Sequence, residues 1–496
     1  MDVVIIGAGP SGLLLAHYLL EKGAGRFRIS LNDAREDPRI TIKRPPTARR
    51  YSIGISMRGR MALKGVDGLW EAIKARGVEI DHMNIFVMGR MIERPPANKG
   101  GQPVMTDRTS LCAAMLELLV QRHGKSGLLS LHFLHKCTGV DLDKRIVTFS
   151  DVQEHEDIHN GGLKMPGNKA PEKPSQSVAT YDLLVGADGV RSVVRAAFMQ
   201  HLRSFDYEQR DLGSELIIAN IPPMPAVPRD VVVMIGGKKG GLGGLMLPSA
   251  LSPDGETSMC LILKWADGAR PAEWFAQKSA ADAKRFLERT FPWLQIPEEA
   301  AGSLLTQRPS KSMQIKCSQY HDSDGAAVIM GDAAHASGPS IGQGVNTAFG
   351  DAAALASLLL KMGDPSELPA VLERFSALRV LEGHALVDLS ESQNPASSAT
   401  GTLNSVRVII QGLLRRFFPK WFAGPIIAMA AGLKPLTEIY AIHKAAVDSV
   451  LEGNRKHRTA LLERRHREKL QGLEALLPNG TASGHVAADP GLKKTA

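Results

Sequence analysis

The sequence is poor in cysteine, and this scarcity removes two classes of protein. Its 496 residues include four cysteines, which are Cys112, Cys137, Cys260 and Cys317, and no two of them have a paired spacing. A disulfide framework and a cysteine-based zinc site are therefore not expected, and no other metal is expected either. This cysteine usage fits a reducing, cytoplasmic setting.

The sequence also lacks an apolar run long enough to cross a bilayer. The most apolar stretch, residues 422–433, has twelve residues and contains Gly424, Pro425 and Gly432. A membrane-spanning helix needs about 20 apolar residues. Because an apolar strand pattern begins at residue 2, no signal or transit peptide is expected before it.

The positive charge is unevenly distributed. The chain has 60 Lys and Arg against 51 Asp and Glu, a formal net charge of +9. Residues 455–469, from Arg455 to Lys469, hold seven Lys or Arg and two Glu, which is more than half of the excess. A solvated terminal helix explains this, and peripheral membrane contact with anionic lipid is the alternative. A nucleic-acid partner is not expected, because the charge lies in a single stretch.

The N-terminal residues form a strand, a glycine turn and a helix pattern. An apolar run at residues 2–6 is followed by Gly7-Ala8-Gly9-Pro10-Ser11-Gly12. Gly7 permits the turn, Gly9 lets the backbone approach a pyrophosphate, and Gly12 allows close helix packing. Asp33 follows a second predicted strand, where a carboxylate can accept hydrogen bonds from a ribose. Because such turns also have purely structural roles, this pattern alone leaves that alternative open beside an FAD or NAD site.

Two further motifs resemble parts of a flavoenzyme. The first is Asp188-Gly189 at the end of a predicted strand over residues 181–185, and the second is Gly331-Asp332-Ala333-Ala334-His335 followed by Gly342-Gln343-Gly344-Val345-Asn346. With the N-terminal turn, they resemble the three signatures of the single-component FAD-dependent aromatic hydroxylases. Their order and spacing are similar over nearly the whole chain.

That resemblance implies a fold and a domain order. We expect an α/β protein with a Rossmann-like FAD-binding domain of the para-hydroxybenzoate hydroxylase type, an interleaved β-sheet substrate domain and a C-terminal helical region. The expected ranges are residues 1–70, 105–200 and 325–380 for the FAD-binding domain, 71–104 and 201–324 for the substrate domain, 381–470 for the helical region and 471–496 for a disordered tail.

The resemblance also implies an activity. The expected enzyme is a monooxygenase that uses NADPH or NADH and O2, and hydroxylates a small aromatic substrate through a flavin C4a-hydroperoxide. No residue is assigned to catalysis with certainty, and His335 is expected more as a structural hydrogen-bonding group than as an acid or base.

The motif residues have distinct expected roles towards FAD. Asp332 is expected to accept hydrogen bonds from ribityl hydroxyls, and Gly331 to allow close approach of the backbone. Helix amides near Gly344, Val345 and Asn346 are expected to face the flavin pyrimidine edge. Asp188 and Gly189 are expected near the pyrophosphate and the nicotinamide donor.

Within this group the chain is most similar to the kynurenine 3-monooxygenase family. The similarity is carried by residues 33–39, 52–60, 205–207, 315–318 and 385–390. It implies FAD contacts from Arg108, at the start of a helix, and from residues around Asp33 and Gly54. The complete set of expected cofactor-binding residues is Gly7, Gly9, Ser11, Gly12, Asp33, Ala34, Arg35, Glu36, Gly54, Arg108, Asp188, Gly189, Gly331, Asp332, Gly344, Val345 and Asn346.

The substrate positions depart from that family. Its carboxylate-binding arginine falls on Arg90, whose guanidinium suits the task, and Gln393 stands where an asparagine is expected. The expected tyrosine falls on Val104, an aromatic pair is replaced by Ser340-Ile341, and a second tyrosine by an apolar residue near Ile427. Kynurenine and a different polycyclic or isoprenoid scaffold are therefore both open as substrates. A low-turnover flavin-bearing protein that binds a membrane or partner is a further alternative, favoured only by residues 455–469.

Overall fold

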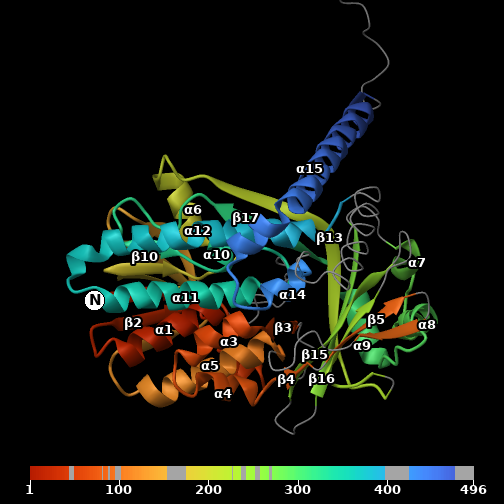
Figure 1. Ribbon diagram of the computed structural model, residues 1–496, viewed down its shortest axis with the longest axis horizontal. Coiled ribbons are helices and arrows are strands. Elements are labelled where there is room, and N and C mark those ends of the chain that lie inside the picture. The colour runs from red at the N-terminus through yellow and green to blue at the C-terminus, as the bar shows by residue number, and fades with distance from the viewer. Residues whose placement is uncertain are drawn as a thin grey trace, which may run out of the picture.

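The computed structural model describes residues 1–43, 50–80, 82–87, 90–94, 102–152, 175–225, 227–235, 242–251, 257–266, 271–396 and 424–474. Four sheets and the helices around them account for most of this chain. Figure 1 shows the N-terminal sheet and its helices on one side and a second large sheet on the other.

A five-stranded parallel sheet lies at the N-terminal side, in the order β18-β12-β1-β2-β8. Its strands are β1 (Asp2–Ile6), β2 (Arg28–Asn32), β8 (Leu129–His132), β12 (Leu183–Gly186) and β18 (Ala327–Ile329). The three strands in the centre and at the β18 edge are almost wholly apolar and buried, as expected for a parallel sheet covered on both faces. All three glycine-containing motifs follow the C-terminal ends of these strands.

Helices cover this sheet and form one core with it. The long ones are α1 (Pro10–Lys22), α5 (Arg108–His123), α11 (Gly344–Lys361) and α12 (Leu368–Ser392), and the short ones are α2 (Pro38–Thr41), α3 (Met57–Lys64), α4 (Leu69–Lys74), α6 (Val193–His201), α10 (Asp332–His335) and the 3-10 turn η1 (Pro365–Glu367). Helix α1 packs on both α5 and α11, and α12 packs on the other side of α11.

Two three-stranded sheets flank this part. One contains β9 (His135–Asp141), β10 (Ile146–Asp151) and β11 (Gln176–Thr180), and the other contains β3 (Ser52–Ile55), β7 (Val104–Asp107) and β4 (Val78–Glu79). Residues 153–174, between β10 and β11, lie outside the described residues.

A seven-stranded sheet has the order β17-β13-β16-β15-β14-β5-β6. Its strands are β5 (His82–Val87), β6 (Arg90–Arg94), β13 (Tyr207–Ile221), β14 (Val231–Ile235), β15 (Gly243–Leu251), β16 (Thr257–Ala266) and β17 (Ser310–Cys317). Helices α7 (Ala272–Phe275), α8 (Ala280–Thr290) and α9 (Glu298–Thr306) cover one face, where Trp274, Phe286 and Leu287 join its core. The long strand β13 lies between β17 and β16 (Figure 1). Its first part pairs with β17, and its last part pairs with β16.

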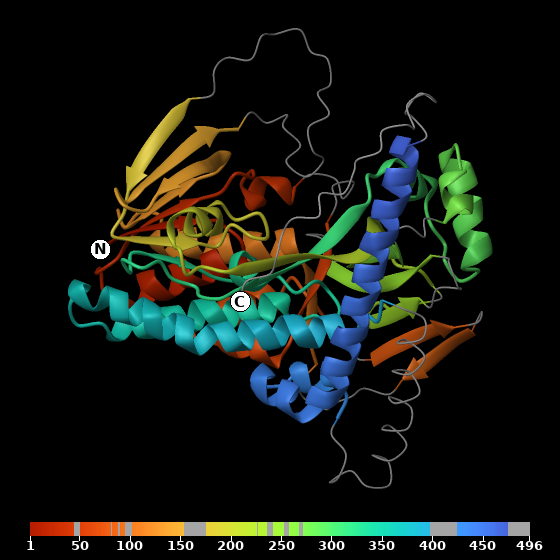
Figure 2. The ribbon, with the colours of Figure 1, turned by 90° about the horizontal axis from the view of Figure 1, so that it is seen from above.

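The C-terminal part is helical. Helix α14 (Ile426–Ala430) and the long helix α15 (Leu436–Glu474) follow α12, and α15 packs across the end of α12 before projecting beyond the rest of the molecule (Figures 1 and 2). No helix within the described residues is both long and apolar enough to cross a membrane.

The α/β architecture agrees with the prediction, and the domain boundaries stay predictions. Ile73 and Val104, from the range 71–104 assigned to the substrate domain, belong to the core around the five-stranded sheet. Helix α15 continues to Glu474, into the range 471–496 predicted as a tail. Residues 475–496 lie outside the described residues.

Candidate functional site

The glycine turn after β1 is packed so closely against the backbone that no side chain fits at Gly7 or Gly12. Gly7 has a φ of +109°, and a Cβ there would lie 2.2 Å from the Ala187 carbonyl oxygen. At Gly12 a Cβ would lie 2.1 Å from the Gly7 carbonyl oxygen. Helix α1 therefore begins directly against β1, with Gly9 as its N-cap residue and no side-chain cap. Its first amides remain available for an anion such as a pyrophosphate.

Asp33 holds this turn in place. It is buried, and its Oδ2 accepts a hydrogen bond of 2.8 Å from the Ala8 amide. The Arg35 guanidinium donates to both Asp33 carboxylate oxygens, at 2.9 and 2.7 Å. Burial alone would lower the pKa of Arg35, but the adjacent Asp33 raises it overall. Asp33 was predicted as a ribose ligand, and the structure adds that it fixes the glycine turn. Its neighbours Ala34 and Glu36 are half-buried.

Arg108 lies beside the same turn. It is the first residue of α5, after Asp107, whose side chain caps the helix by accepting from the Ser110 amide. A Cβ at Gly9 would lie 3.4 Å from an Arg108 guanidinium nitrogen. The Arg108 amide also donates to the Tyr51 carbonyl oxygen at 3.3 Å. The predicted arginine is thus next to the predicted pyrophosphate position.

The second and third motifs are connected by one buried arginine. Arg195 donates to the carbonyl oxygens of Val190, at 2.7 Å, and Ala333, at 2.8 Å. Asp188 accepts from the Val193 amide at 2.6 Å at the start of α6, although burial raises its pKa. Gly189 has a φ of +79° and no atom near a Cβ position, so its surface is open. Arg195 thereby fixes the Asp188-Gly189 turn relative to Asp332.

The loop of Gly331 and Asp332 lies against the first motif. Gly331 has a φ of +60°, and a Cβ there would be 3.2 Å from Ser11 Oγ. Asp332 is exposed, and among the described residues nothing hydrogen-bonds its carboxylate. Protein atoms crowd around it enough for burial to raise its pKa, an effect that His335 opposes. Its carboxylate is therefore free to accept ligand hydroxyls.

A buried ion pair supports that loop from below. Asp351 Oδ2 lies 2.5 Å from His335 Nε2 and accepts from the Gly331 amide at 3.0 Å. Asp351 Oδ1 accepts from Arg379 Nε at 2.7 Å. Burial would raise the pKa of Asp351, but His335 and Arg379 lower it to about 2. The expectation that His335 is structural is consistent with these contacts.

The start of α11 is tied to β3 by Asn346. Its Nδ2 donates to the Gly54 carbonyl oxygen at 2.9 Å, and its Oδ1 accepts from the Ser56 amide at 2.9 Å. Because this side chain is fully engaged by protein, any contact of Asn346 with a cofactor has to come from its backbone. Helix α11 has no side-chain cap, so the first-turn amides of Gly344 and Val345 remain available.

These contacts bring the three predicted motifs together and fit a dinucleotide. Gly7 packs on Ala187, Gly331 on Ser11, and Arg195 on Ala333. Uncapped helix amides, the open Gly189 and the free Asp332 carboxylate are the groups that an FAD molecule needs. Sequence reasoning gave no role to Asp351, Arg379 or Arg195. Arg195 lies only a few residues after the Asp188-Gly189 motif, but nothing in the sequence pairs it with Ala333.

The comparison with protein families decides the assignment. The family model described as "FAD binding domain" matches residues 1–390. The chain belongs to the FAD binding domain family. FAD is therefore its cofactor. The chain is an FAD-dependent monooxygenase of the aromatic hydroxylase type.

Curated relatives cover most of the chain at low identity. Violacein synthase of Chromobacterium violaceum is 25% identical over 432 residues, covering 84% of this chain and 90% of the relative. Kynurenine 3-monooxygenase of Caenorhabditis elegans is 27% identical over 397 residues, covering 78% of this chain and 80% of the relative. The predicted resemblance to the kynurenine 3-monooxygenase family is confirmed at this level.

Solved structures confirm the fold class. The tetrameric form of 2-methyl-3-hydroxypyridine-5-carboxylic acid oxygenase has a TM-score of 0.60 at 19% identity, covering 88% of this chain and 97% of that chain. PqsL of Pseudomonas aeruginosa in complex with 2-aminobenzoylacetate has a TM-score of 0.57 at 20% identity, covering 79% and 95%. The para-hydroxybenzoate hydroxylase-like fold is thus established.

The predicted substrate residues are less closely grouped. Arg90 begins β6 and is exposed, and Gln393 follows α12, where its Nε2 donates to Ser392 Oγ at 3.1 Å. Val104 is fully buried, and a Cβ at Gly77 would lie 2.3 Å from its Cγ1. Val104 is therefore a core residue of β7. No contact between Arg90 and Gln393 is present in the described part of the chain.

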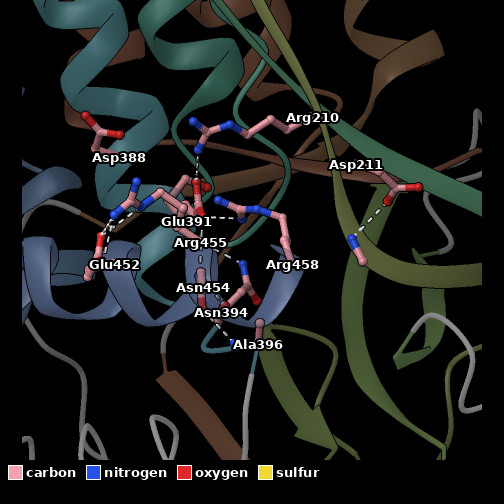
Figure 3. A network of polar contacts seen from close by, with 12 residues as sticks. Arg210, Asp211, Asp388, Glu391, Asn394, Ala396, Glu452, Asn454, Arg455 and Arg458 are labelled. Carbon is pink, nitrogen blue, oxygen red and sulfur yellow. Dashed lines mark hydrogen bonds and ion pairs between the residues drawn. The ribbon is translucent and has the colours of Figure 1, made fainter. Parts of the chain in front are cut away.

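A buried carboxylate connects the C-terminal helix to the long strand of the seven-stranded sheet. Glu391 on α12 is 2% exposed and lies 2.7 Å from Arg458 on α15 and 3.4 Å from Arg210 on β13. Asn454 also donates to Glu391, at 3.3 Å, and to the Asn394 carbonyl oxygen, at 3.1 Å. Figure 3 shows these side chains converging on Glu391 from β13 and α15. The network fixes α15 relative to α12 and β13.

The same helix contains the basic residues 455–469. Arg458 pairs with Glu391, Arg455 with Glu452 and Arg464 with Glu468. Part of the positive charge is thus neutralised within the protein. The comparisons give no support to a membrane contact through this stretch.

Proposed function

We propose that this protein is an NADPH- or NADH-dependent FAD monooxygenase that hydroxylates an aromatic substrate, in the manner of the kynurenine 3-monooxygenases. The observation that carries the proposal is the convergence of three motifs, spread over more than 300 residues of the chain, through the Gly331–Ser11 and Arg195–Ala333 contacts. Low identity to the curated relatives leaves the substrate and the nicotinamide donor as the parts that experiment has to test.

The residues present divide the work of binding FAD. Helix α1, with its uncapped N-terminus behind Gly9, would bind the pyrophosphate together with Arg108. The free Asp332 carboxylate would accept ribityl hydroxyls, and the amides of Gly344 and Val345 would face the pyrimidine edge. Bound and reduced by NAD(P)H, FAD supplies the two electrons that let O2 donate one oxygen atom to an aromatic ring.

The chain's own contribution to the reaction is binding and positioning. Arg90 is the proposed anchor for an anionic group of the substrate, because a guanidinium forms two parallel hydrogen bonds with a carboxylate. Gln393 is proposed on the opposite, helical side of the substrate. Arg90→Leu should raise the substrate KM while leaving FAD content intact, and an unchanged KM would remove Arg90 from the site.

A related monooxygenase with a larger polycyclic or isoprenoid substrate is the second candidate. Ile341, where an aromatic residue is expected, is buried in the same apolar cluster as Leu386 and Leu389 of α12. Ser340 Oγ accepts a hydrogen bond from Asn394. Both side chains are thus turned into the C-terminal helical region, and neither offers an aromatic surface to a substrate.

One experiment separates these candidates. NADPH oxidation by the purified yellow protein is measured with and without L-kynurenine, and the product is analysed by mass spectrometry. Stimulated oxidation with a product one oxygen heavier supports kynurenine hydroxylation. Oxidation without that product favours the second candidate, and a protein that neither binds FAD nor oxidises NADPH or NADH contradicts the proposal altogether.

A further inference from the structure

The two faces of the seven-stranded sheet are chemically different. Alternate residues of β16, Leu261, Leu263 and Trp265, join the core beneath α7, α8 and α9. The intervening residues Cys260, Ile262 and Lys264 lie on the opposite face. We call this opposite face, with its register partners on β13 and β15, the inner face.

The inner face borders the FAD-binding part of the molecule at both of its ends. At one end, Asn220 Nδ2 donates to the Arg50 carbonyl oxygen at 3.2 Å, and Cys260 Sγ lies 3.7 Å from the same oxygen. At the other end, Leu212 of β13 lies against Gly338, where a Cβ would be 2.3 Å from Leu212 Cδ1. The centre of the inner face therefore lies between these two contacts.

The segments next to both ends of the inner face are those expected to hold the flavin ring. Leu247 on the inner face packs in a cluster with Met105, and a Cβ at Gly54 would lie 3.0 Å from Met105 Sδ. Gly338 precedes the loop that enters α11, and Asn346 of α11 hydrogen-bonds the Gly54 carbonyl oxygen. The substrate of the proposed reaction has to lie between these segments and the centre of the inner face.

The residues at that centre form two rows across the strands. In the first row, Ile262 is opposite Ile218 on β13 and Leu245 on β15. In the next row, Lys264 is opposite Leu216 and Gly243. Successive rows on one face of a strand are about 7 Å apart. The apolar side chains of the first row are thus followed, at about the width of one aromatic ring, by the single cationic side chain of Lys264.

Lys264 has no anionic partner of its own. In the stretches of chain that the structure describes, no carboxylate forms an ion pair with it and no acceptor hydrogen-bonds its ammonium group. Solvent reaches the side chain, but surrounding protein atoms bury it enough to lower its pKa. A cation held among apolar residues gains more from an anionic ligand than one in open solvent does.

We propose that Lys264 binds a carboxylate of the substrate whose aromatic ring lies on Ile218, Leu245 and Ile262. This inference rests on the proposed function and narrows its substrate to an aromatic acid. Lys264 and Arg90 are alternative anchors for this carboxylate, because β6 lies four strands from β16 in the sheet order, or about 19 Å along the sheet, which is too far for one small aromatic acid to reach both. It is a specificity-determining residue that takes no part in the oxygen transfer.

The test uses equilibrium dialysis of the FAD-loaded protein against two fluorescent ligands of the same shape, 2-aminobenzoate and 2-aminobenzamide. The wild type is expected to bind the acid about tenfold more tightly than the amide, since hydrogen bonds to charged groups are the strong ones. Lys264→Met should abolish this preference by weakening only the acid, and Lys264→Arg should restore most of it. Lys125→Met, which removes an exposed charge beyond α5, is the matched control and should bind like the wild type.

Three outcomes would overturn the proposal: no binding of the acid to the wild type, unchanged acid binding by Lys264→Met, or equal weakening of acid and amide. The last would mean that Lys264 only supports the fold. FAD content and NADPH oxidation of every variant are recorded in parallel. A wild-type protein that neither contains FAD nor oxidises NADPH contradicts the proposed function itself. A yellow, NADPH-oxidising protein with no preference for the acid contradicts only the role of Lys264.

Discussion

The carboxylate of Asp351 lies 2.5 Å from His335 Nε2 and accepts a hydrogen bond of 3.0 Å from the Gly331 amide. One buried side chain thus supports the backbone on which Asp332 is placed. Because Asp351 is fully buried and its carboxylate is engaged by Gly331, His335 and Arg379, it is a positioning residue. Its effect should be visible in FAD binding before it is visible in the reaction.

Replacing this carboxylate should weaken FAD binding and the fold together. Asp351→Asn leaves Arg379 and His335 without their buried anion, which is expected to cost about 3 kcal/mol of unfolding free energy. We expect the FAD Kd of the apoprotein, measured by quenching of flavin fluorescence, to rise about tenfold. Asp364→Asn, at an exposed cap of η1, should leave that Kd unchanged. An FAD Kd equal to wild type in Asp351→Asn would contradict the positioning role.

The same residue predicts a dependence of stability on acid. The pKa of Asp351 is about 2 in the folded protein, below its ordinary value of 3.8. Its contribution of about 2 kcal/mol is therefore complete above pH 4 and is lost as the pH falls towards 2. Urea unfolding at several pH values should show the wild type losing about 2 kcal/mol more than Asp351→Asn between pH 5 and pH 2. Parallel pH profiles would show that this carboxylate is not the group concerned.

Arg195 should be needed to hold two motifs in register. Arg195→Met removes the donors to the carbonyl oxygens of Val190 and Ala333, at an expected cost of about 3 kcal/mol. The purified variant should contain less FAD per chain than the wild type, as read from its absorbance ratio. Arg191→Met removes an exposed arginine from the same loop and should keep full FAD content. Equal FAD content in both variants would disprove the link.

Gly7 offers a test of the glycine turn that does not depend on charge. Gly7→Ala would place a methyl group 2.2 Å from the Ala187 carbonyl oxygen at a φ of +109°. We expect a protein with little bound FAD and a lower melting temperature. Gly25→Ala has a comparable φ of +79° with no atom within 4 Å, so it should cost only about 1 kcal/mol of backbone strain. Similar behaviour of the two variants would mean that strain, and not the contact with Ala187, controls the turn.

Glu391 should control the attachment of α15. Glu391→Gln leaves Arg210 and Arg458 without their common carboxylate. Hydrogen exchange of α15 amides is expected to become faster, with a loss of about 2 kcal/mol in unfolding free energy. Glu452→Gln breaks an exposed pair with Arg455, which solvent screens, so this variant should unfold like the wild type. Protection of α15 that is as strong in Glu391→Gln as in Glu452→Gln would rule out the anchoring role.

The parts of the site that were predictable from sequence are those encoded by neighbouring residues. The strand, turn and helix over residues 2–22, the Gly331-Asp332 turn and the start of α11 each depend on local backbone geometry, so a short motif specifies them. FAD binding could be predicted for the same reason.

The residues that hold the motifs together could not be predicted in this way. Arg195 and Ala333 are 138 residues apart, and only the order of the parallel strands brings them together. The direction of the Val104 side chain was not predictable either. The family comparison placed Val104 where a tyrosine is expected, and only its pairing with Ile55 and its packing on Gly77 show that it lies in the core. Side-chain direction depends on strand register, which a motif does not contain.

The strand order β18-β12-β1-β2-β8 also affects how the sheet can form while the chain is being synthesised. The first strand made, β1, has to wait for β12 before its second edge is covered, and the sheet gains its last strand only with β18, at residues 327–329. A chain still on the ribosome therefore carries an open, apolar sheet edge through most of its synthesis.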